Sequence, residues 1–235
     1  MANQRTQMLS QVKNRERSIL KNVYLWMTAG LALTGVISYL VATNETLMRI
    51  FLGSWVSLIF VIIAQFALVF YLTARLEKMS STAAMAAFMG YSILTGITLS
   101  VIFLAYSGLV ISRAFFTTAA AFGGMSLYGM TTKRDLDGIG HYLIMGLWGI
   151  IIASLINMLL GSANIYYLIS IIGVLVFLGL TAWDTQKIKR MNDAYGSHMD
   201  EDTYIKLSII GALILYLDFI NIFLFLLRIF GRNNR

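Results

Sequence analysis

An aspartate at position 218 lies in the middle of an almost purely hydrocarbon segment, LYLDFINIFLFLL at 215–227. A second aspartate, Asp184, ends another apolar segment in LTAWDTQKIKRM, and Arg75 ends a third in FYLTARLEKM. Ionisable side chains within long apolar segments are rare, and they commonly mark ion paths, proton relays or buried ion pairs. These three residues are therefore the first candidates for functional residues.

Two carboxylates that lie close together would share one proton, because ionising both at short distance is costly. Such a pair would respond to pH, and Arg75 would act as its latch by neutralising it. The two aspartates can meet if the helix around Asp184 continues through Thr185–Met191, which contains no helix breaker. If that helix ended at Asp184, the two would differ in height by roughly 10 Å or more. The alternatives are a packed neutral acid at Asp218, a helix-end residue at Asp184 and an interfacial anchor at Arg75.

Three other intramembrane chemistries fit these residues poorly. An aspartyl protease would need a GxGD motif where the chain has LYLD, and a proline-containing motif although the chain has no proline. A retinal protein would need a lysine in the middle of its seventh span, but Lys206 stands only at the start of that span. A metal enzyme would need clustered ligands, whereas His141 and His198 are far apart in the sequence. We therefore expect no enzymatic activity, no catalytic residue and no cofactor.

Composition identifies a membrane protein. Of the 235 residues, 58% are hydrophobic and 12% are charged, and the mean hydropathy is +0.75, whereas soluble domains are about 25% charged. The net charge of +7 does not indicate nucleic acid, because the basic residues gather at the ends of apolar segments, where they meet lipid headgroups. The absence of cysteine excludes disulfides and thiolate metal sites.

The apolar segments are long enough to cross a membrane as helices, each needing about 20 residues. The sequence predicts an all-α polytopic membrane protein with a basic cytoplasmic tail at 1–22, a transmembrane domain at 23–230 and a short tail at 231–235. Short linkers favour a single compact bundle. The seven predicted spans are 23–43, 54–74, 82–106, 113–131, 142–161, 164–187 and 204–230.

The distribution of lysine and arginine predicts the orientation. Thirteen of the 18 lie in the N-terminal segment and the even-numbered loops, and five lie on the other side. The positive-inside rule therefore places the N-terminus in the cytoplasm. Three C-terminal arginines, Arg228, Arg232 and Arg235, run against this bias. The C-terminal sequence GRNNR carries no eukaryotic retention signal, which favours a bacterial inner membrane.

Two local patterns predict details of structure. The acidic segment HMDEDTY at 198–204 is typical of a solvated loop in which Asp200 or Asp202 caps the last span. Small residues in two spans favour close contact with neighbouring helices: Gly90, Gly96 and Ser100 in the third span, and Ala120 and Gly124, four residues apart, in the fourth.

Three segments together resemble the transmembrane Bax inhibitor-motif family, also called lifeguard: WDTQKIKR at 183–190, LYLDFINIFLFLLRIFG at 215–231 and LTGITLSVIF at 94–103. The resemblance implies a bacterial member with a seven-helix bundle whose last helix is central. It also implies a pH-sensitive calcium leak and, in eukaryotic relatives, suppression of cell death. The paired aspartates of the family correspond to Asp184 and Asp218, and its latch arginine corresponds to Arg75.

The residues limit what such a site can bind. Calcium prefers about six to eight oxygen ligands, so Asp184 and Asp218, with Asn221 lining the path, would form a weak or transient Ca²⁺ site. We expect a passive, proton-modulated Ca²⁺ channel whose partners are membrane lipid, Ca²⁺ and protons. The alternative is a non-conducting interaction protein that regulates a membrane AAA protease or a cell-death pathway. Some bacterial relatives of that kind lack the second aspartate, which this chain retains.

Overall fold

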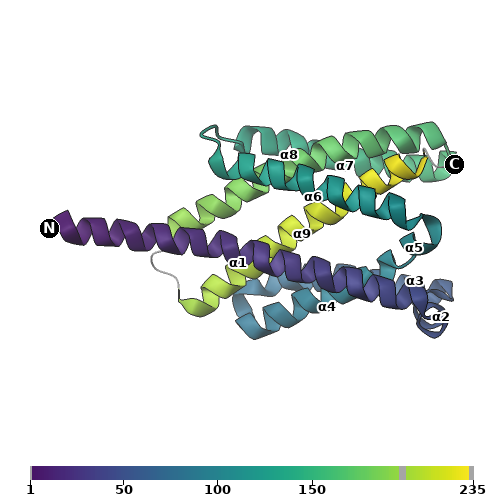
Figure 1. Ribbon diagram of the computed structural model, residues 1–235, viewed down its shortest axis with the longest axis horizontal. Coiled ribbons are helices and arrows are strands. Elements are labelled where there is room, and N and C mark those ends of the chain that lie inside the picture. Colours follow the sequence, from purple (N-terminus) through teal and green to yellow (C-terminus); the bar gives the residue numbers. More distant parts are fainter. Residues whose placement is uncertain (1, 196–199, 233–235) are drawn as a thin grey trace. The chain divides into compact units, whose positions relative to one another are not determined.

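A computed structural model describes residues 2–195 and 200–232, and every regular element in these ranges is a helix. Within them, seven helical segments are long and apolar enough to cross a membrane. This confirms the all-α polytopic fold predicted from the sequence. Figure 1 shows the helices in chain order: α1 (Ala2–Thr43), α2 (Glu45–Leu52), α3 (Trp55–Arg75), η1 (Leu76–Lys78), α4 (Ser81–Leu99), α5 (Ile102–Ala105), α6 (Gly108–Thr131), α7 (Asp137–Leu160), α8 (Ala163–Tyr195) and α9 (Glu201–Arg232).

The observed spans extend beyond the predicted ones at several ends. The fourth span begins at Gly108 instead of residue 113, and the fifth begins at Asp137 instead of residue 142. The sequence prediction started these spans at Arg113 and directly after His141, but both helices begin five residues earlier, because a helix can extend beyond the hydrocarbon region. The segment expected as a basic tail is helical from Ala2 and runs into the first span without a break.

The last helix is the most buried span of the described chain. In α9, 67% of the most apolar window is buried, compared with at most 39% in the other spans. Its buried residues include both bulky apolar side chains and the carboxyl group of Asp218. This burial is what a helix with neighbours on most of its sides requires.

The chain divides into two compact units. Unit 1 comprises residues 1–105 and 190–216, and unit 2 comprises residues 106–189 and 217–235. Helices α8 and α9 each contribute to both units. The domain boundaries predicted at residues 22 and 230 stay predictions.

Unit 1 is held by close contact between α1 and α4 at two glycines. A Cβ atom at Gly30 would lie 2.7 Å from the Phe88 ring, and one at Gly96 would lie 2.8 Å from the Thr34 carbonyl oxygen and from Ile37. Any larger side chain would therefore push the two helices apart. This confirms the prediction that Gly96 mediates close contact between helices. The same prediction is wrong for Gly124, where an added Cβ atom would meet nothing within 4 Å, and Gly90 has only an ordinary contact with Leu68 at 3.6 Å.

A polar cluster lies between these helices and the first half of α9. The Thr34 hydroxyl donates to the Ser92 carbonyl oxygen at 2.9 Å and lies 2.7 Å from the Tyr216 hydroxyl. The Tyr216 ring packs edge-on against Phe88 and Tyr91, with both centroid distances 5.8 Å. The cluster satisfies buried hydroxyl groups that would otherwise be costly within an apolar core.

The acidic segment before α9 differs from the prediction. The backbone of Asp200 does accept the first hydrogen bond of α9, from the amide of Tyr204. The carboxylate of Asp202, however, accepts from the Ser81 amide at 2.8 Å, so it caps α4. Lys206 lies 3.0 Å from Asp202 and donates to the Met79 carbonyl oxygen at 3.3 Å. A contact so distant in sequence could not be read from local capping patterns.

Unit 2 also depends on glycines where α8 meets its neighbours. Gly129 of α6 lies against the backbone carbonyl of Ala182. Gly179 of α8 lies against Leu143 of α7, at 2.8 Å from an added Cβ atom to the leucine Cδ2. These contacts fix α8 immediately before Asp184 and therefore position the candidate site.

Candidate functional site

The position of Asp184 depends on the length of α8. This helix continues without a break from Ala163 to Tyr195, and the transmembrane span within it reaches Met191. The condition derived from the sequence, a helix that continues through Thr185–Met191, is met. Asp184 therefore lies within the span, where its side chain is half-buried.

Asp218 carries the one carboxyl side chain that is buried among the described residues. Its side chain is only 5% exposed, and its Oδ2 atom has no hydrogen-bond partner among the described residues. The carboxyl group interacts electrostatically with Asp184 and lies within hydrogen-bonding reach of Thr181. The structure thus brings the two predicted aspartates together on α8 and α9.

The surroundings of the pair combine one nearby cation with an apolar wall. Lys187, one turn after Asp184, interacts with that carboxylate and also lies 5.2 Å from the centre of the Trp183 ring. Phe219 packs edge-on against Phe115 and Phe122, with centroid distances of 5.7 and 5.5 Å. The residue after Asp218 therefore belongs to an aromatic cluster with α6, and Asp218 itself is only 5% exposed.

The WDTQKIKR segment positions Asp184 through Gln186. The side-chain oxygen of Gln186 accepts from the Leu136 amide at 3.0 Å, and its nitrogen donates to the Arg134 carbonyl oxygen at 2.8 Å. One side chain therefore satisfies a backbone donor and a backbone acceptor in the α6–α7 loop. Because Gln186 is 5% exposed, these bonds form in a poorly hydrated place and are costly to lose.

Two further residues of the same segment hold this loop. The Trp183 ring nitrogen donates to Asp137 Oδ1 at 2.9 Å, and Lys189 donates to the Met130 carbonyl oxygen at 3.0 Å. The segment thus has a structural role besides the carboxylate. It fastens the α6–α7 loop to α8 and so fixes the rotation of α8 that turns Asp184 toward Asp218.

The two remaining candidates from the sequence are Asn221 and Arg75. Asn221 is half-buried one turn after Asp218, and its amide nitrogen donates to the Leu217 carbonyl oxygen at 2.8 Å. Its side-chain oxygen is the atom that it would offer to a cation. Arg75 ends α3 with an exposed side chain in unit 1, whereas the aspartates belong to unit 2, so its role as a latch stays a prediction.

Metal ligands do not gather elsewhere in the described ranges. Residues 2–195 and 200–232 contain no group of three or more His, Asp or Glu side chains that could hold a metal ion. His141 lies in α7, with its ring nitrogen 2.9 Å from the Asp137 carbonyl oxygen, and His198 lies outside the described residues.

Sequence reasoning missed the residues that complete the site. Thr181 lies one turn before Asp184, and Thr185 is fully buried with its hydroxyl 3.5 Å from Ser126. The spacing of three residues between Thr181 and Asp184, about one helical turn, was a usable signal. Thr185, one residue after Asp184, faces another direction and contacts Ser126 of α6. The contact between Gly129 and Ala182 had no comparable signal, because glycine is common in membrane helices.

Comparisons with known proteins identify the family. A family model described as inhibitor of apoptosis-promoting Bax1 matches residues 16–235. The inner membrane protein YbhL of Escherichia coli K12 is 49% identical over 215 residues, covering 92% of both chains. A protein of Borreliella burgdorferi is 44% identical over 232 residues, covering 96% of this chain and 98% of its own length. A protein of Deinococcus radiodurans is 42% identical over 213 residues. The chain is therefore a multi-pass membrane protein that belongs to the Bax inhibitor family.

Proposed function

We propose that this protein is a passive, proton-modulated Ca²⁺ leak channel of a bacterial inner membrane. The observation that carries the proposal is the carboxyl group of Asp218, which is 5% exposed, interacts with Asp184 and has one oxygen with no hydrogen-bond partner in the described part of the chain. A carboxyl group in that position is costly within a membrane, and ionisable residues kept there usually serve an ion path or a proton relay.

The pair offers a simple proton-dependent gate. When both groups are ionised, their mutual repulsion favours binding of a cation or a proton between them. When they share a proton, the local negative charge falls and a cation is bound less well. The groups that face the pair are Lys187, which acts on Asp184, and the hydroxyl of Thr181, which acts on Asp218. Because the two carboxyl groups interact, they titrate as one unit, and Lys187 and Thr181 both influence that unit.

The number of ligands favours passage over tight binding. Two carboxylates, the Thr181 hydroxyl and the Asn221 side-chain oxygen provide fewer ligands than the about six to eight oxygens that Ca²⁺ prefers. The ion would retain part of its water shell at such a site. A weak, transient site suits a leak, because an ion must leave as readily as it enters.

The proposed orientation has a cytoplasmic N-terminus. Its support is the excess of Lys and Arg in the N-terminal segment and the even-numbered loops. The inner membrane location is supported by the name of the Escherichia coli relative. In this orientation, Asp184 lies toward the cytoplasmic end of α8.

Calcium flux into liposomes tests the activity. Purified protein is reconstituted with a Ca²⁺-sensitive dye inside the vesicles, and wild type is compared with Asp218→Asn and Glu45→Gln. Glu45 is an exposed carboxylate in the first turn of α2, so its variant removes one negative charge far from the pair. We expect wild type and Glu45→Gln to conduct alike, and Asp218→Asn to differ from both.

The opposite result would favour the other class of function. Wild-type vesicles that admit no more Ca²⁺ than empty vesicles, at every pH between 5 and 8, would contradict the channel. The chain would then be better explained as an interaction protein acting on a membrane protease or a cell-death pathway.

The latch role of Arg75 has its own test. If the guanidinium neutralises the ionised pair, Arg75→Ala should raise the basal leak by about fivefold, the equivalent of about 1 kcal/mol. Arg75→Lys should raise it less, because lysine keeps the charge but loses the planar fork. Equal leak in both variants and wild type would leave Arg75 as an interfacial anchor.

A further inference from the structure

Two arginines at the end of α9 lie at an end of unit 2 that has no acidic residue. Arg228 is half-buried and Arg232 is exposed in the last turns of the helix. The closest carboxylate along α9 is Asp218, ten residues before Arg228, or about 15 Å. The acidic residues of unit 2 are Asp135, Asp137, Asp184 and Asp218. The positive charge at this end is therefore not balanced by side chains of the described unit.

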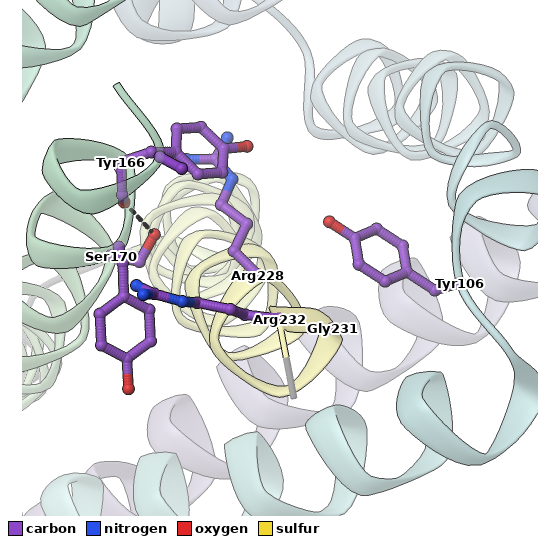
Figure 2. Close-up of a pocket in the computed structure, with 8 residues that line it drawn as sticks. Tyr106, Tyr166, Ser170, Arg228, Gly231 and Arg232 are labelled. Atoms are coloured by element: carbon purple, nitrogen blue, oxygen red, sulfur yellow. Dashed lines mark hydrogen bonds between the residues drawn. The ribbon is translucent and has the colours of Figure 1, made fainter. Parts of the chain in front are cut away.

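Tyrosine rings orient both guanidinium groups, as Figure 2 shows for Arg228 and Tyr166. Arg228 lies 4.8 Å from the centre of the Tyr166 ring, and Arg232 lies 4.5 Å from that of Tyr167. Arg232 also donates to Asn164 Oδ1 at 3.3 Å. A guanidinium held by its flat face leaves N–H donors at its edge for a planar or tetrahedral anion.

Arg228 lines two adjoining cavities, and Arg232 lines the first of them. The first has a volume of about 340 Å³ and places Tyr106 across from both arginines (Figure 2). The second has a volume of about 420 Å³ and shares Arg228, Tyr166 and Ala163 with the first. Because α8 begins at Ala163, the positive end of its helix dipole also borders both cavities. The site is thus a hollow with two cations, hydroxyl donors and no acid.

We propose that this hollow, the Arg228–Arg232 site, binds the phosphate of an anionic phospholipid headgroup. Arginine recognises phosphate through two parallel hydrogen bonds, which suits oriented guanidinium groups. Tyrosines are typical of the membrane interface, where headgroups lie. Leu159 and Leu160, at the neighbouring end of α7, are 86% and 63% exposed and offer acyl chains an apolar surface. The arginines would bind the phosphate of the lipid, and the exposed leucines would contact its acyl chains.

The proposal explains why these arginines run against the charge bias of the chain. Basic residues on the side opposite the cytoplasm are normally few. A bound phosphate would balance the charge of Arg228 and Arg232. The simpler explanation is that both arginines only complement the negative end of the α9 dipole. The two explanations differ because only a site predicts saturable binding that depends on the headgroup.

Thermal unfolding with short-chain lipids tests the proposal. The full chain is purified in a nonionic detergent and titrated with dioctanoyl phosphatidylglycerol, dioctanoyl phosphatidylcholine or inorganic phosphate. A ligand that binds the folded state raises the unfolding temperature with its concentration. We expect phosphatidylglycerol to do so saturably. We expect the Arg228→Gln/Arg232→Gln variant to need about tenfold more lipid for half of the effect.

The matched control is Arg49→Gln/Arg113→Gln. Arg49 and Arg113 are exposed arginines that the charge analysis places on the same membrane side, so this variant removes the same charge from that side. It should titrate as wild type does. Arg228→Lys/Arg232→Lys keeps the charge but loses the flat stacking surface, so we expect an intermediate shift. This lysine variant also carries the test if the glutamine variant does not fold.

Three outcomes would overturn the proposal. The first is an equal change, in the control and in the Arg228–Arg232 variants, of the phosphatidylglycerol concentration that gives half of the effect. The effect would then come from overall charge. The second is equal half-saturation by phosphatidylcholine, which would remove the preference for an anionic headgroup. The third is saturation by inorganic phosphate at the same concentration and with the same arginine dependence, which would make a soluble anion the ligand.

Discussion

Helices α8 and α9 of unit 2 hold opposite charges at two places. At one, Asp184 and Asp218 interact, and Asp218 is 5% exposed with one oxygen that no described residue hydrogen-bonds. At the other, Arg228 and Arg232 each lie against a tyrosine ring and keep access to the surface. The carboxylates occupy a position where charge is costly, whereas the arginines occupy one where charge is well accommodated. The first arrangement therefore points to a titrating site and the second to recognition of a ligand.

An apolar layer separates the two places. Phe177 of α8 and Phe225 of α9 lie 5.9 Å apart between ring centres, and Gly173 gives the Phe225 ring room to lie against the α8 backbone. These rings lie between the aspartates and the arginines along both helices. The two sites should therefore respond independently, since substitutions without shared partners usually add.

The largest expected effect is a difference in cysteine labelling, which shows which side of the membrane the aspartate pair and the arginine site each lie toward. The chain has no cysteine, so a single introduced cysteine reports one position. Asn3→Cys should react with an impermeant reagent only from the cytoplasm, and Ser107→Cys, in the loop before α6, only from the other side. Together these results would place the aspartates toward the cytoplasm and the arginines at the opposite surface. Labelling of Asn3→Cys from outside would reverse that assignment.

A smaller effect is expected from a glycine substitution that destabilises the part of α8 next to Asp184 and leaves the arginine site unchanged. Gly129→Ala places a Cβ atom against the Ala182 carbonyl and should lower the free energy of unfolding by about 1–3 kcal/mol. Gly124→Ala, in the same helix, meets nothing within 4 Å and should be neutral or slightly stabilising. Unfolding in detergent measures both. We expect Gly129→Ala to disturb Ca²⁺ flux but to retain binding of phosphatidylglycerol, because the displaced part of α8 carries Asp184.

Much of the pair was predictable from sequence. The charge of Asp218 among apolar residues is evident from the sequence of 215–227. The lack of a helix breaker after Asp184 allowed the helix to continue, as α8 does, although the sequence left the alternative open. Both inferences rest on local properties of a helix in lipid: its length, its hydrocarbon content and its cost of burying charge. The seven spans followed from the same properties.

The rest depended on contacts between segments distant in sequence. Asp200 or Asp202 was expected to cap the last span; the backbone of Asp200 begins α9, but the carboxylate of Asp202 accepts from the Ser81 amide at the start of α4. Gln186 holds the loop before α7, and no pattern within 183–190 reveals which backbone groups it meets. Arg228 and Arg232 were visible only as exceptions to the charge bias. Their tyrosine partners lie more than 60 residues away along the chain.

The smallest expected effect is the loss of the hydrogen bond from Trp183 to Asp137, which helps to position Asp184. Trp183→Phe keeps an aromatic ring but removes the hydrogen bond to Asp137, which should cost about 0.5–1.5 kcal/mol in unfolding. Trp148→Phe is the matched control, because that ring is 61% exposed. A loss of stability that is equal in the two variants would show that the Asp137 bond contributes nothing.

The central claim is that Asp184 and Asp218 act as one proton-binding unit that controls Ca²⁺ passage. The most direct test is the pH profile of Ca²⁺ flux in liposomes for wild type, Asp184→Asn, Asp218→Asn and the double variant, measured between pH 5 and 8. We predict that each single variant flattens the profile and that the double variant adds little to either, because residues that act as a unit are not additive. Single variants that retain the wild-type pH profile would contradict the claim and leave Asp218 as a packed, neutral carboxylic acid.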